Sequence, residues 1–172
     1  MKQAIEGLAF YCGDFVNTDV IAPGRFEPYQ GPDELARYSL IDYDSEPPFV
    51  DPETGKSPYK VIVAGREFGV GSSRETAPLG LHYAGCEVII AKSFATIFYR
   101  NCINMGIILP IISDHPFDQS IIGKPVVVDL EAGFFSIEGQ RYKIPDFGPV
   151  LEIIKAGGLT HYTRQRMENR QQ

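Results

Sequence analysis

The chain has 172 residues, which is enough for one domain with a substantial hydrophobic core. Hydrophobic residues make up 44% of it and charged residues 22%, as in typical globular proteins, and the formal net charge is −6. This acidic balance argues against general nucleic-acid binding, and the apolar runs are too short to span a membrane. No secretory signal is recognisable. We therefore expect one domain over residues 1–172, cytoplasmic, with neither a nucleic-acid nor a membrane partner.

The sequence contains three cysteines, Cys12, Cys86 and Cys102, at wide spacing. Their odd number does not suggest a disulfide framework, and no Cys-x-x-Cys pair is present for zinc. An iron–sulfur cluster takes several thiolates at characteristic spacing, which these residues do not offer. We expect the thiols to be structural and the chain to hold no metal.

The first third of the chain is predicted to contain one strand, one helix and much loop. Residues 8–12 form the strand and residues 17–19 a turn. Proline and glycine indicate a loop over residues 25–32, after which residues 32–38 open a helix. Residues 44–59 are again rich in proline and are predicted to be a surface loop.

The middle of the chain alternates strands and helices. A β-branched strand over residues 59–65 leads into a glycine-rich loop. The elements that follow are helix 74–84, strand 87–91, helix 94–102 and strand 107–112. Gly85 and Gly106 are expected to stop the two helices. This order favours parallel strands joined by right-handed crossovers.

The last third of the chain changes character. Short strands over residues 125–130, 134–137 and 140–144 are separated by glycine-containing turns, which indicates an antiparallel meander. A helix over residues 149–156 follows, and residues 164–170 are interpreted as a solvated helix face or tail. We thus predict an α/β fold with a mixed sheet, in which a parallel βαβαβ part joins short antiparallel strands.

The loop Gly69-Val70-Gly71-Ser72-Ser73-Arg74-Glu75 lies between a strand and a helix and predicts an anion site. Glycines let the backbone approach a ligand, and the free N–H groups of a helix start favour negative charge. Ser72 and Ser73 add hydroxyls, and the guanidinium of Arg74 can bind a carboxylate at two points. On this motif alone, a plain glycine-rich turn with a serine cap remains the alternative.

Three other motifs are excluded at this loop. A dinucleotide-binding fingerprint needs glycine where Arg74 stands, and a P-loop needs a lysine that the loop lacks. No histidine lies within the loop to activate a serine, so a Ser-His-Asp hydrolase is unsupported.

Four blocks of the sequence resemble the aconitase swivelling domain, most closely the stand-alone small subunits of isopropylmalate dehydratase and homoaconitase. They follow the family's order and span nearly the whole chain: residues 13–24, 63–78, 91–106 and 146–159. Ala22 stands where aconitases proper have serine, which favours the small subunits. Thr76 departs from the histidine of many relatives. The resemblance implies a swivelling β/β/α domain with a mixed sheet.

The resemblance also implies roles for individual residues. Ser72 matches the serine that acts as catalytic base on a substrate carbon, and Asp19 matches an active-site acid. Ser73 and Arg74 match the residues that hold substrate carboxylates, with Gly71 beside them. Because a serine hydroxyl is a weak base, we expect neighbouring N–H groups and Arg74 to favour its alkoxide. Without the resemblance, Asp19 reads equally well as a turn residue.

In this family the [4Fe–4S] cluster lies on a separate large subunit, where its open iron binds the substrate hydroxyl as a Lewis acid. The resemblance therefore implies no cofactor on this chain and a large iron–sulfur partner, in a heterodimer or heterotetramer. The implied reaction is dehydration and rehydration of a di- or tricarboxylate, which moves a hydroxyl between adjacent carbons.

The first substrate that the resemblance suggests is 3-isopropylmalate, in leucine biosynthesis. Acids of the 2,3-dimethylmalate and homoaconitate types are the alternatives. A non-catalytic anion-binding module is a further interpretation, which the intact Ser72, Ser73 and Arg74 disfavour.

Relatives use the loop that corresponds to Arg25-Phe26-Glu27-Pro28-Tyr29 to select the substrate's variable group. Glycine and proline around it favour a mobile loop that closes over the substrate. The selecting positions carry Glu27, Pro28 and Tyr29, so no cation there offsets the desolvation of an additional carboxylate. We predict a preference for an alkyl-substituted malate, with Glu27 either facing the site, where it repels a carboxylate, or facing solvent.

Overall fold

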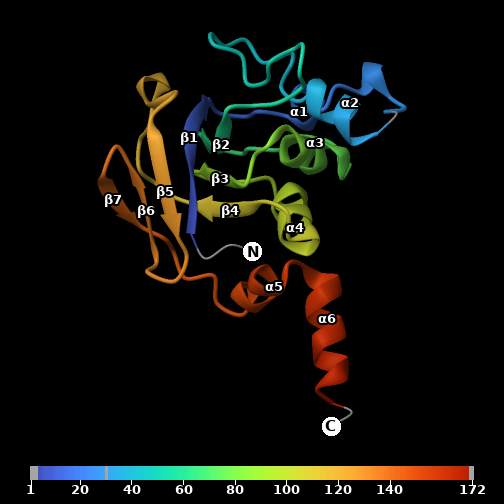
Figure 1. Ribbon diagram of the computed structural model, residues 1–172, viewed down its shortest axis with the longest axis vertical. Helices are drawn as coiled ribbons and strands as arrows, with labels where there is room; N and C mark the ends of the chain where they lie inside the picture. The colour runs from blue at the N-terminus through green and yellow to red at the C-terminus, as the bar shows by residue number, and fades with distance from the viewer. Residues whose placement is uncertain (1–3, 30, 171–172) are drawn as a thin grey trace.

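The computed structural model describes residues 4–29 and 31–170, which form one mixed sheet with helices around it (Figure 1). The seven strands lie in the order β4-β3-β2-β1-β5-β6-β7. Their bounds are Ala4–Cys12 (β1), Tyr59–Ala64 (β2), Val88–Ala91 (β3), Leu109–Ile112 (β4), Pro125–Asp129 (β5), Phe134–Ile137 (β6) and Gln140–Lys143 (β7). Strands β1 to β4 pair in parallel, and β5 to β7 continue from β1 in antiparallel pairing. The predicted α/β class with a mixed sheet is confirmed, whereas the single domain over residues 1–172 stays a prediction.

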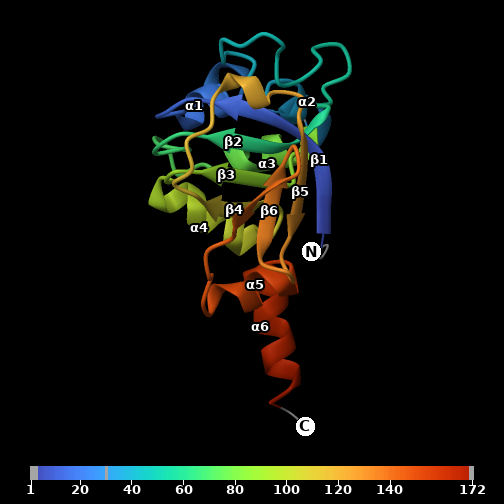
Figure 2. The same ribbon diagram turned by 90° about the vertical axis from the view of Figure 1, so that its left-hand side faces the viewer.

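The helices are α1 (Thr18–Ile21), α2 (Pro32–Arg37), α3 (Thr76–Ala84), α4 (Thr96–Met105), α5 (Val150–Ala156) and α6 (Leu159–Glu168). Short 3₁₀ turns cover Gly24–Phe26 (η1) and Gln119–Ile121 (η2). Helices α3 and α4 lie on one side of the parallel strands, and β5 to β7 turn across the other side (Figures 1 and 2). The sheet therefore curls around one core while helices cover a second.

Successive side chains of the parallel strands pack alternately into these two cores. In β2, Ile62 and Ala64 belong to the core under the helices, which also contains Leu81 of α3. Val61 and Val63 point to the opposite core, which the antiparallel strands complete. A strand buried on both faces needs a continuous apolar run, and this explains the composition of β2.

Two glycines end the helices that pack on the parallel strands, as the sequence predicted. Gly85 follows α3 with φ 120°, and Gly106 follows α4 with φ 66°. A Cβ atom at Gly106 would lie 2.2 Å from the carbonyl carbon of Gly157. The end of α4 is thus packed backbone to backbone against the junction of α5 and α6, where a side chain has no room.

Several element boundaries differ from the sequence prediction. Strand β1 begins at Ala4 rather than residue 8, because its first residues pair with β5, far away in the sequence. The predicted turn at residues 17–19 opens α1, and the side chain of Asn17 caps it by accepting the amide of Val20 at 2.8 Å. Helix α3 begins at Thr76, two residues later than predicted, because the residues before it remain in the glycine-rich loop.

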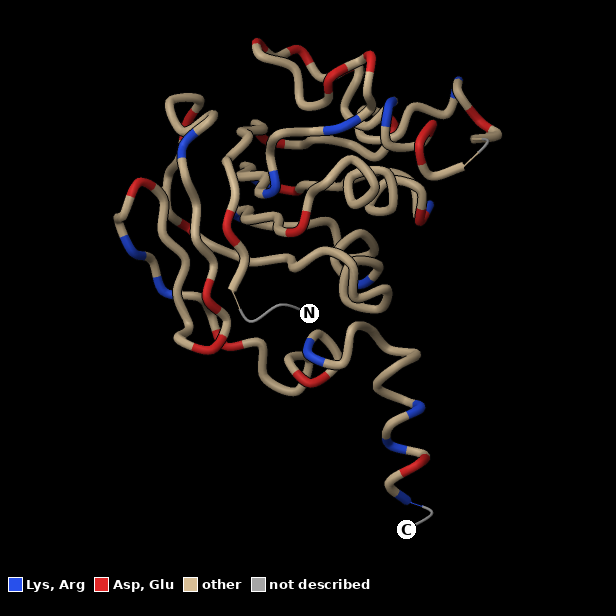
Figure 3. Tube along the Cα trace, in the orientation of Figure 1, with Lys and Arg blue, Asp and Glu red and all other residues tan. Residues whose placement is uncertain are grey.

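Helix α6 lies beyond the last predicted helix. It has no buried residue and projects away from the body of the molecule (Figures 1 and 2). Figure 3 shows mostly basic charged residues on it, while both acidic and basic residues are spread over the rest of the described chain. These features agree with the interpretation of residues 164–170 as a solvated helix face. No helix in residues 4–29 and 31–170 is long and apolar enough to cross a membrane.

Candidate active site

The glycine-rich loop follows β2 and is fixed by backbone contacts with the segment after β1. The amide of Gly69 donates to the carbonyl of Val16, and the amide of Thr18 donates to the carbonyl of Val70, both at 2.8 Å. Gly69 and Gly71 have φ 82° and 118°, values that favour glycine. A Cβ atom at Gly69 would lie 2.2 Å from the ring of Phe98. These glycines let the loop pass between α1 and α4.

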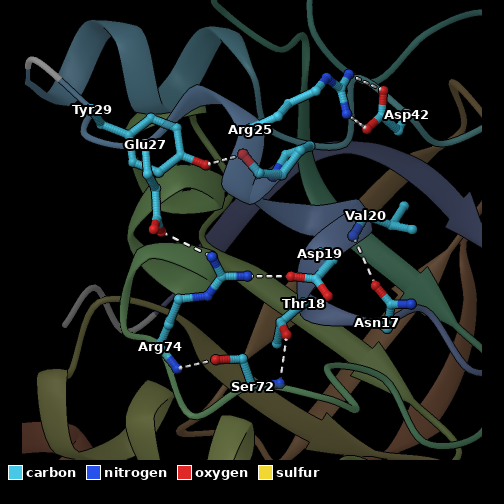
Figure 4. A network of polar contacts seen from close by, with 11 residues as sticks. Asn17, Thr18, Asp19, Val20, Arg25, Glu27, Tyr29, Asp42, Ser72 and Arg74 are labelled. Carbon is cyan, nitrogen blue, oxygen red and sulfur yellow. Dashed lines mark hydrogen bonds and ion pairs between the residues drawn. The ribbon is translucent and has the colours of Figure 1, made fainter.

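Ser72 is oriented by its neighbours on both sides (Figure 4). Its amide donates to Oγ1 of Thr18 at 2.8 Å, and Thr18 is only 1% exposed. Its own Oγ accepts the amide of Arg74 in a long hydrogen bond of 3.4 Å. The hydroxyl is therefore held where a backbone donor can stabilise negative charge on it.

The guanidinium of Arg74 lies between two carboxylates (Figure 4). Its Nη1 donates to Oε1 of Glu27 at 2.9 Å, and its Nη2 contacts Oδ1 of Asp19. The Arg74 side chain is 28% exposed, and that of Asp19 is 71% exposed. The structure thus brings Ser72, Asp19 and Arg74 together and places Glu27 on the arginine, while their catalytic and binding roles stay predictions.

Ser73 lies at the exposed edge of the same loop. Its carbonyl accepts the side-chain amide of Asn101, on α4, at 3.2 Å. Ser73 and Gly71 are both exposed, so a ligand that reaches Arg74 can also reach them.

The segment Arg25–Tyr29 covers Arg74 and is tied down at several points. Arg25 forms a two-point ion pair with Asp42, with Nη2 at 2.6 Å from Oδ1, and points away from Arg74 (Figure 4). This contact lowers the pKa of Asp42. The ring of Phe26 stacks on Tyr38 at 3.8 Å between centroids. The hydroxyl of Tyr29 donates to the carbonyl of Pro23 at 2.9 Å.

A hollow of about 660 Å³ opens beneath this segment. Its apolar lining includes Pro28, Tyr29, Leu35 and Tyr83, and its polar lining includes Glu27 and Thr76. The hydroxyl oxygen of Thr76 is buried without a hydrogen-bond partner among the described residues. Of the five predicted specificity residues, the structure places Glu27, Pro28 and Tyr29 on the hollow, whereas Arg25 and Phe26 are held outside it.

An ion pair between Asp14 and Arg66 links the segment after β1 with the segment after β2. The carboxylate of Asp14 accepts the backbone amide of Arg66 at 2.7 Å and its side chain at 2.7 and 3.0 Å. These hydrogen bonds hold the pKa of Asp14 below its usual range. Arg66 thus takes part in a structural ion pair beside the glycine-rich loop. The carboxylate of the next residue, Glu67, accepts the hydroxyl of Ser93 at 2.8 Å.

The cysteines do not fit an iron–sulfur cluster. Cys12, Cys86 and Cys102 are all buried in the core under the helices. Burial raises the pKa of all three thiols, that of Cys86 to about 12, so they are held protonated rather than as the thiolates that iron needs. Within the described ranges, no group of three or more His, Cys, Asp or Glu side chains could hold a metal ion.

The described histidines lie in other parts of the fold. His115 packs on Phe117 and Tyr142 in the curled half of the sheet, and the ring of His161 contacts the carbonyl of Gly157. His82 lies on α3 with a buried ring nitrogen. The geometry thus gives Ser72 a backbone donor and a cation on its own loop, and shows no histidine hydrogen-bonded to it.

Comparisons with known proteins identify the family of this chain. A family model described as the aconitase C-terminal domain matches residues 37–115, which include the glycine-rich loop. The isopropylmalate/citramalate isomerase small subunit of Methanocaldococcus jannaschii is 41% identical over 99% of this chain and 100% of its own length. The chain belongs to the isopropylmalate dehydratase small-subunit family. The 3-isopropylmalate dehydratase small subunit of Aquifex aeolicus is 40% identical, again over 99% of this chain and 100% of its own.

The family's fold agrees with the structure described above. A crystal structure of 3-isopropylmalate dehydratase from Methanocaldococcus jannaschii matches it with a TM-score of 0.79, at 40% identity over 98% of both chains. The resemblance drawn from the sequence is therefore confirmed. The family resemblance does not predict the hydrogen-bond partners of the individual residues. Sequence reasoning missed Thr18, which accepts the amide of Ser72, and Asp42, which pairs with Arg25.

Proposed function

We propose that this chain is the small subunit of a heteromeric hydro-lyase that isomerises a malate-like hydroxy acid, 3-isopropylmalate in leucine biosynthesis. The observation that carries the proposal is the grouping of Ser72 and Arg74 of the glycine-rich loop with Asp19 of α1, in a chain that belongs to this family. We propose the cytoplasm as its site of action. The proposal gives each residue a separate task.

Ser72 exchanges a proton with the substrate carbon through Oγ. The substrate C–H proton moves to the alkoxide in dehydration, and the hydroxyl returns it in rehydration. The amide of Arg74 donates to Oγ, and the guanidinium adds positive charge on the same loop. Both favour the oxyanion over the neutral hydroxyl. Thr18 fixes the backbone of Ser72, so the oxygen keeps its direction through the reaction.

Arg74 and Ser73 hold a substrate carboxylate, and Asp19 orients the arginine. A guanidinium matches the planar carboxylate at two points, which places the reacting carbon at a fixed distance from Ser72. The contact between Asp19 and Nη2 fixes the plane of the guanidinium. The carboxylate of Asp19 is exposed, so it can also donate a proton to a departing hydroxyl or accept one from an incoming water.

The chemistry at the hydroxyl requires a partner, and we propose a large subunit that carries a [4Fe–4S] cluster. Such a cluster supplies Lewis-acid activation of the hydroxyl. The support here is that relatives are named small subunits and that the buried thiols of this chain do not suit a cluster. Reconstitution of the isolated chain with iron and sulfide should give no stable chromophore. A chromophore that disappears on replacement of any of the three cysteines would contradict this assignment.

The surface proposed to meet the large subunit is the edge where the parallel strands end. Phe15 after β1, Ile97 after β3 and Ile112 at the end of β4 are 57, 50 and 43% exposed there. The glycine-rich loop follows β2, which lies between β1 and β3, so exposed apolar side chains flank the site on both sides. Phe15 also has φ 57°, a strained conformation for a residue with a Cβ atom. A partner that covers the site buries these side chains as well.

The hollow beneath Arg25–Tyr29 supports an alkyl-substituted substrate. Pro28, Tyr29 and Leu35 can enclose an alkyl group, which is worth about 0.8 kcal/mol per buried CH₂. Arg25, the cation of the segment, is engaged by Asp42 outside the hollow. Among the described residues, no cationic side chain lines the hollow to receive an additional carboxylate, and the carboxylate of Glu27 disfavours one.

The test is to co-purify the chain with its large subunit under anaerobic conditions and to follow hydration and dehydration by NMR. We expect a higher kcat/KM for 3-isopropylmalate than for homoaconitate. The rates with citramalate and 2,3-dimethylmalate, compared with that of 3-isopropylmalate, show which size of alkyl group the hollow prefers. Pro28→Arg should raise the relative rate with homoaconitate. Faster turnover of homoaconitate by the unmodified complex would overturn the alkyl preference, and no turnover of any of these acids would overturn the function.

A further inference from the structure

We infer that Glu27 is an internal substitute for a substrate carboxylate, which occupies Arg74 in the free subunit and leaves when substrate binds. The inference rests on the proposed function for the class of ligand, a hydroxy acid with two carboxylates. It assigns Glu27 a role in setting affinity and selectivity that the glycine-rich loop alone does not provide.

Both terminal nitrogens of Arg74 are already occupied by carboxylates of this chain. Nη1 donates to Glu27 at 2.9 Å, and Nη2 contacts Asp19 (Figure 4). A guanidinium binds an incoming carboxylate best when adjacent N–H groups are free. A ligand carboxylate that binds Arg74 at two points through Nη1 therefore competes with the carboxylate of Glu27 for that nitrogen.

Asp19 is the carboxylate that stays. It belongs to α1, whose first residue is joined to the glycine-rich loop by two hydrogen bonds of 2.8 Å, from Thr18 to Val70 and from Ser72 to Thr18. Arg74 and Asp19 are thus parts of one fixed unit. Withdrawal of Asp19 by a backbone movement would require loss of these bonds, and its short side chain reaches less far from Arg74 than that of a glutamate.

Glu27 is the carboxylate that can leave. It follows the η1 turn, its side chain is 38% exposed, and it borders the hollow of about 660 Å³. Its neighbours Arg25 and Phe26 are held by Asp42 and Tyr38. The backbone can therefore remain in place while the Glu27 side chain rotates, since a glutamate has enough rotatable bonds to swing its carboxylate off Arg74. Release needs a change of rotamer, not an opening of the whole segment.

This exchange makes Glu27 a selectivity device. The apparent affinity of a carboxylate for Nη1 of Arg74 is its intrinsic affinity multiplied by the fraction of molecules in which Glu27 does not occupy that nitrogen. A ligand with one carboxylate gains little net binding free energy, because its contact with Arg74 only replaces that of Glu27. A dicarboxylate that also contacts Ser73 and the partner gains more, so it displaces Glu27 preferentially. The displaced negative charge stays close to the hollow, where it continues to oppose an additional carboxylate.

The experiment measures malate binding to the isolated chain from NMR shifts of the Ser72, Ser73 and Arg74 amides, at constant ionic strength. Glu27→Gln should lower the dissociation constant for malate about tenfold, since it removes both the competing ion pair and its repulsion of the ligand. Glu131→Gln, in the turn between β5 and β6, changes the net charge equally and should leave the constant within about twofold. Combining Glu27→Gln with Arg74→Gln should abolish the gain.

Weaker or unchanged malate binding by Glu27→Gln would overturn the inference, because Glu27 would then position Arg74 or be irrelevant to it. Undetectable binding by every variant would overturn it as well. If Glu27→Gln fails to fold, Glu27→Asp serves instead: it keeps the charge but shortens the reach to Arg74, and it should also tighten binding. In the complex, Glu27→Gln should lower KM for 3-isopropylmalate. Tighter malate binding without any turnover would leave the inference standing and remove the proposed function.

Discussion

The two halves of the sheet are built from the same kind of strand but do different work. In the parallel half, β1 to β4, the segments after neighbouring strands meet at one edge and hold one another through hydrogen bonds between residues about fifty positions apart, such as Asp14 and Arg66. In the antiparallel half, β5 to β7, short turns join neighbouring strands, and their bonds are local, such as Asp129 to the amide of Ala132.

The difference shows how topology creates a site. Parallel strands must be joined by long crossovers, so their ends carry segments from distant parts of the sequence. Those segments bring Ser72, Asp19 and Arg74 together, whereas a hairpin can only bring together its own turn residues. The antiparallel half closes a core, with Val128 and Phe135 buried against β2 and β3, and leaves the edge strand β7 largely exposed.

The largest expected effect is a loss of catalysis when a serine in the parallel half, but not one in the antiparallel half, is replaced. Ser72→Ala in the complex should reduce kcat by about 10²–10⁴-fold or more, the usual loss for a general base. Its amide can still donate to Thr18, so folding should be unchanged by circular dichroism. Ser136→Ala, at a buried serine of β6, is the matched control and should affect stability rather than kcat. Near-normal kcat in Ser72→Ala would show that another group takes the proton.

The next effect compares glycines with positive φ in the two halves. Gly69→Ala should lower the free energy of unfolding by about 3 kcal/mol, from left-handed backbone strain and from overpacking. The overpacking arises because a Cβ atom would lie 2.2 Å from the ring of Phe98. Gly133→Ala, between β5 and β6 at φ 70° with no atom within 4 Å, should cost only about 1 kcal/mol. Urea denaturation measures both, and equal losses would contradict the close approach.

A smaller effect is expected when arginine is replaced by lysine. Arg74→Lys should raise KM for 3-isopropylmalate about 10- to 100-fold, the range expected when hydrogen bonds to a charged group are lost, because an ammonium cannot make the planar two-point contact. Arg141→Lys in β7, where the guanidinium lies 4.4 Å from the ring of Phe134, should leave KM unchanged. Steady-state kinetics of the two variants decide the point. An unchanged KM in Arg74→Lys would mean that substrate carboxylate binds elsewhere.

The sequence predicted most of what depends on local pattern. The apolar run of β2 and the glycines after α3 and α4 indicated those elements correctly, because a buried strand and a helix end each have a local signature. The start of β1 was missed because Ala4 to Gly7 become a strand only by pairing with β5. The motif identified Ser72 and Arg74, but Glu27 on Arg74 and Thr18 on Ser72 are tertiary contacts without a local signal.

The smallest expected effect is a pH dependence that also tests the comparison. The backbone amide and the side chain of Arg66 lower the pKa of Asp14 from its ordinary value of about 3.9. A depressed pKa in the folded state means that this stabilisation is fully present above about pH 4 and is lost as the pH falls through the folded value. Asp14→Asn should therefore destabilise the protein at pH 7, and the difference from the unmodified chain should shrink below pH 4.

Asp118, just before β5, provides the counterpart. Hydrogen bonds from Ser120 lower its pKa as well, but they join residues only two positions apart. Asp118→Asn should show a stability difference of the same sign and pH dependence. Only Asp14→Asn, however, should speed amide hydrogen exchange at Gly69 and Ser72, because Asp14 ties the segment after β1 to the one that carries the glycine-rich loop. Faster exchange of the loop in Asp118→Asn, or none in Asp14→Asn, would show that the site does not depend on contacts between distant segments.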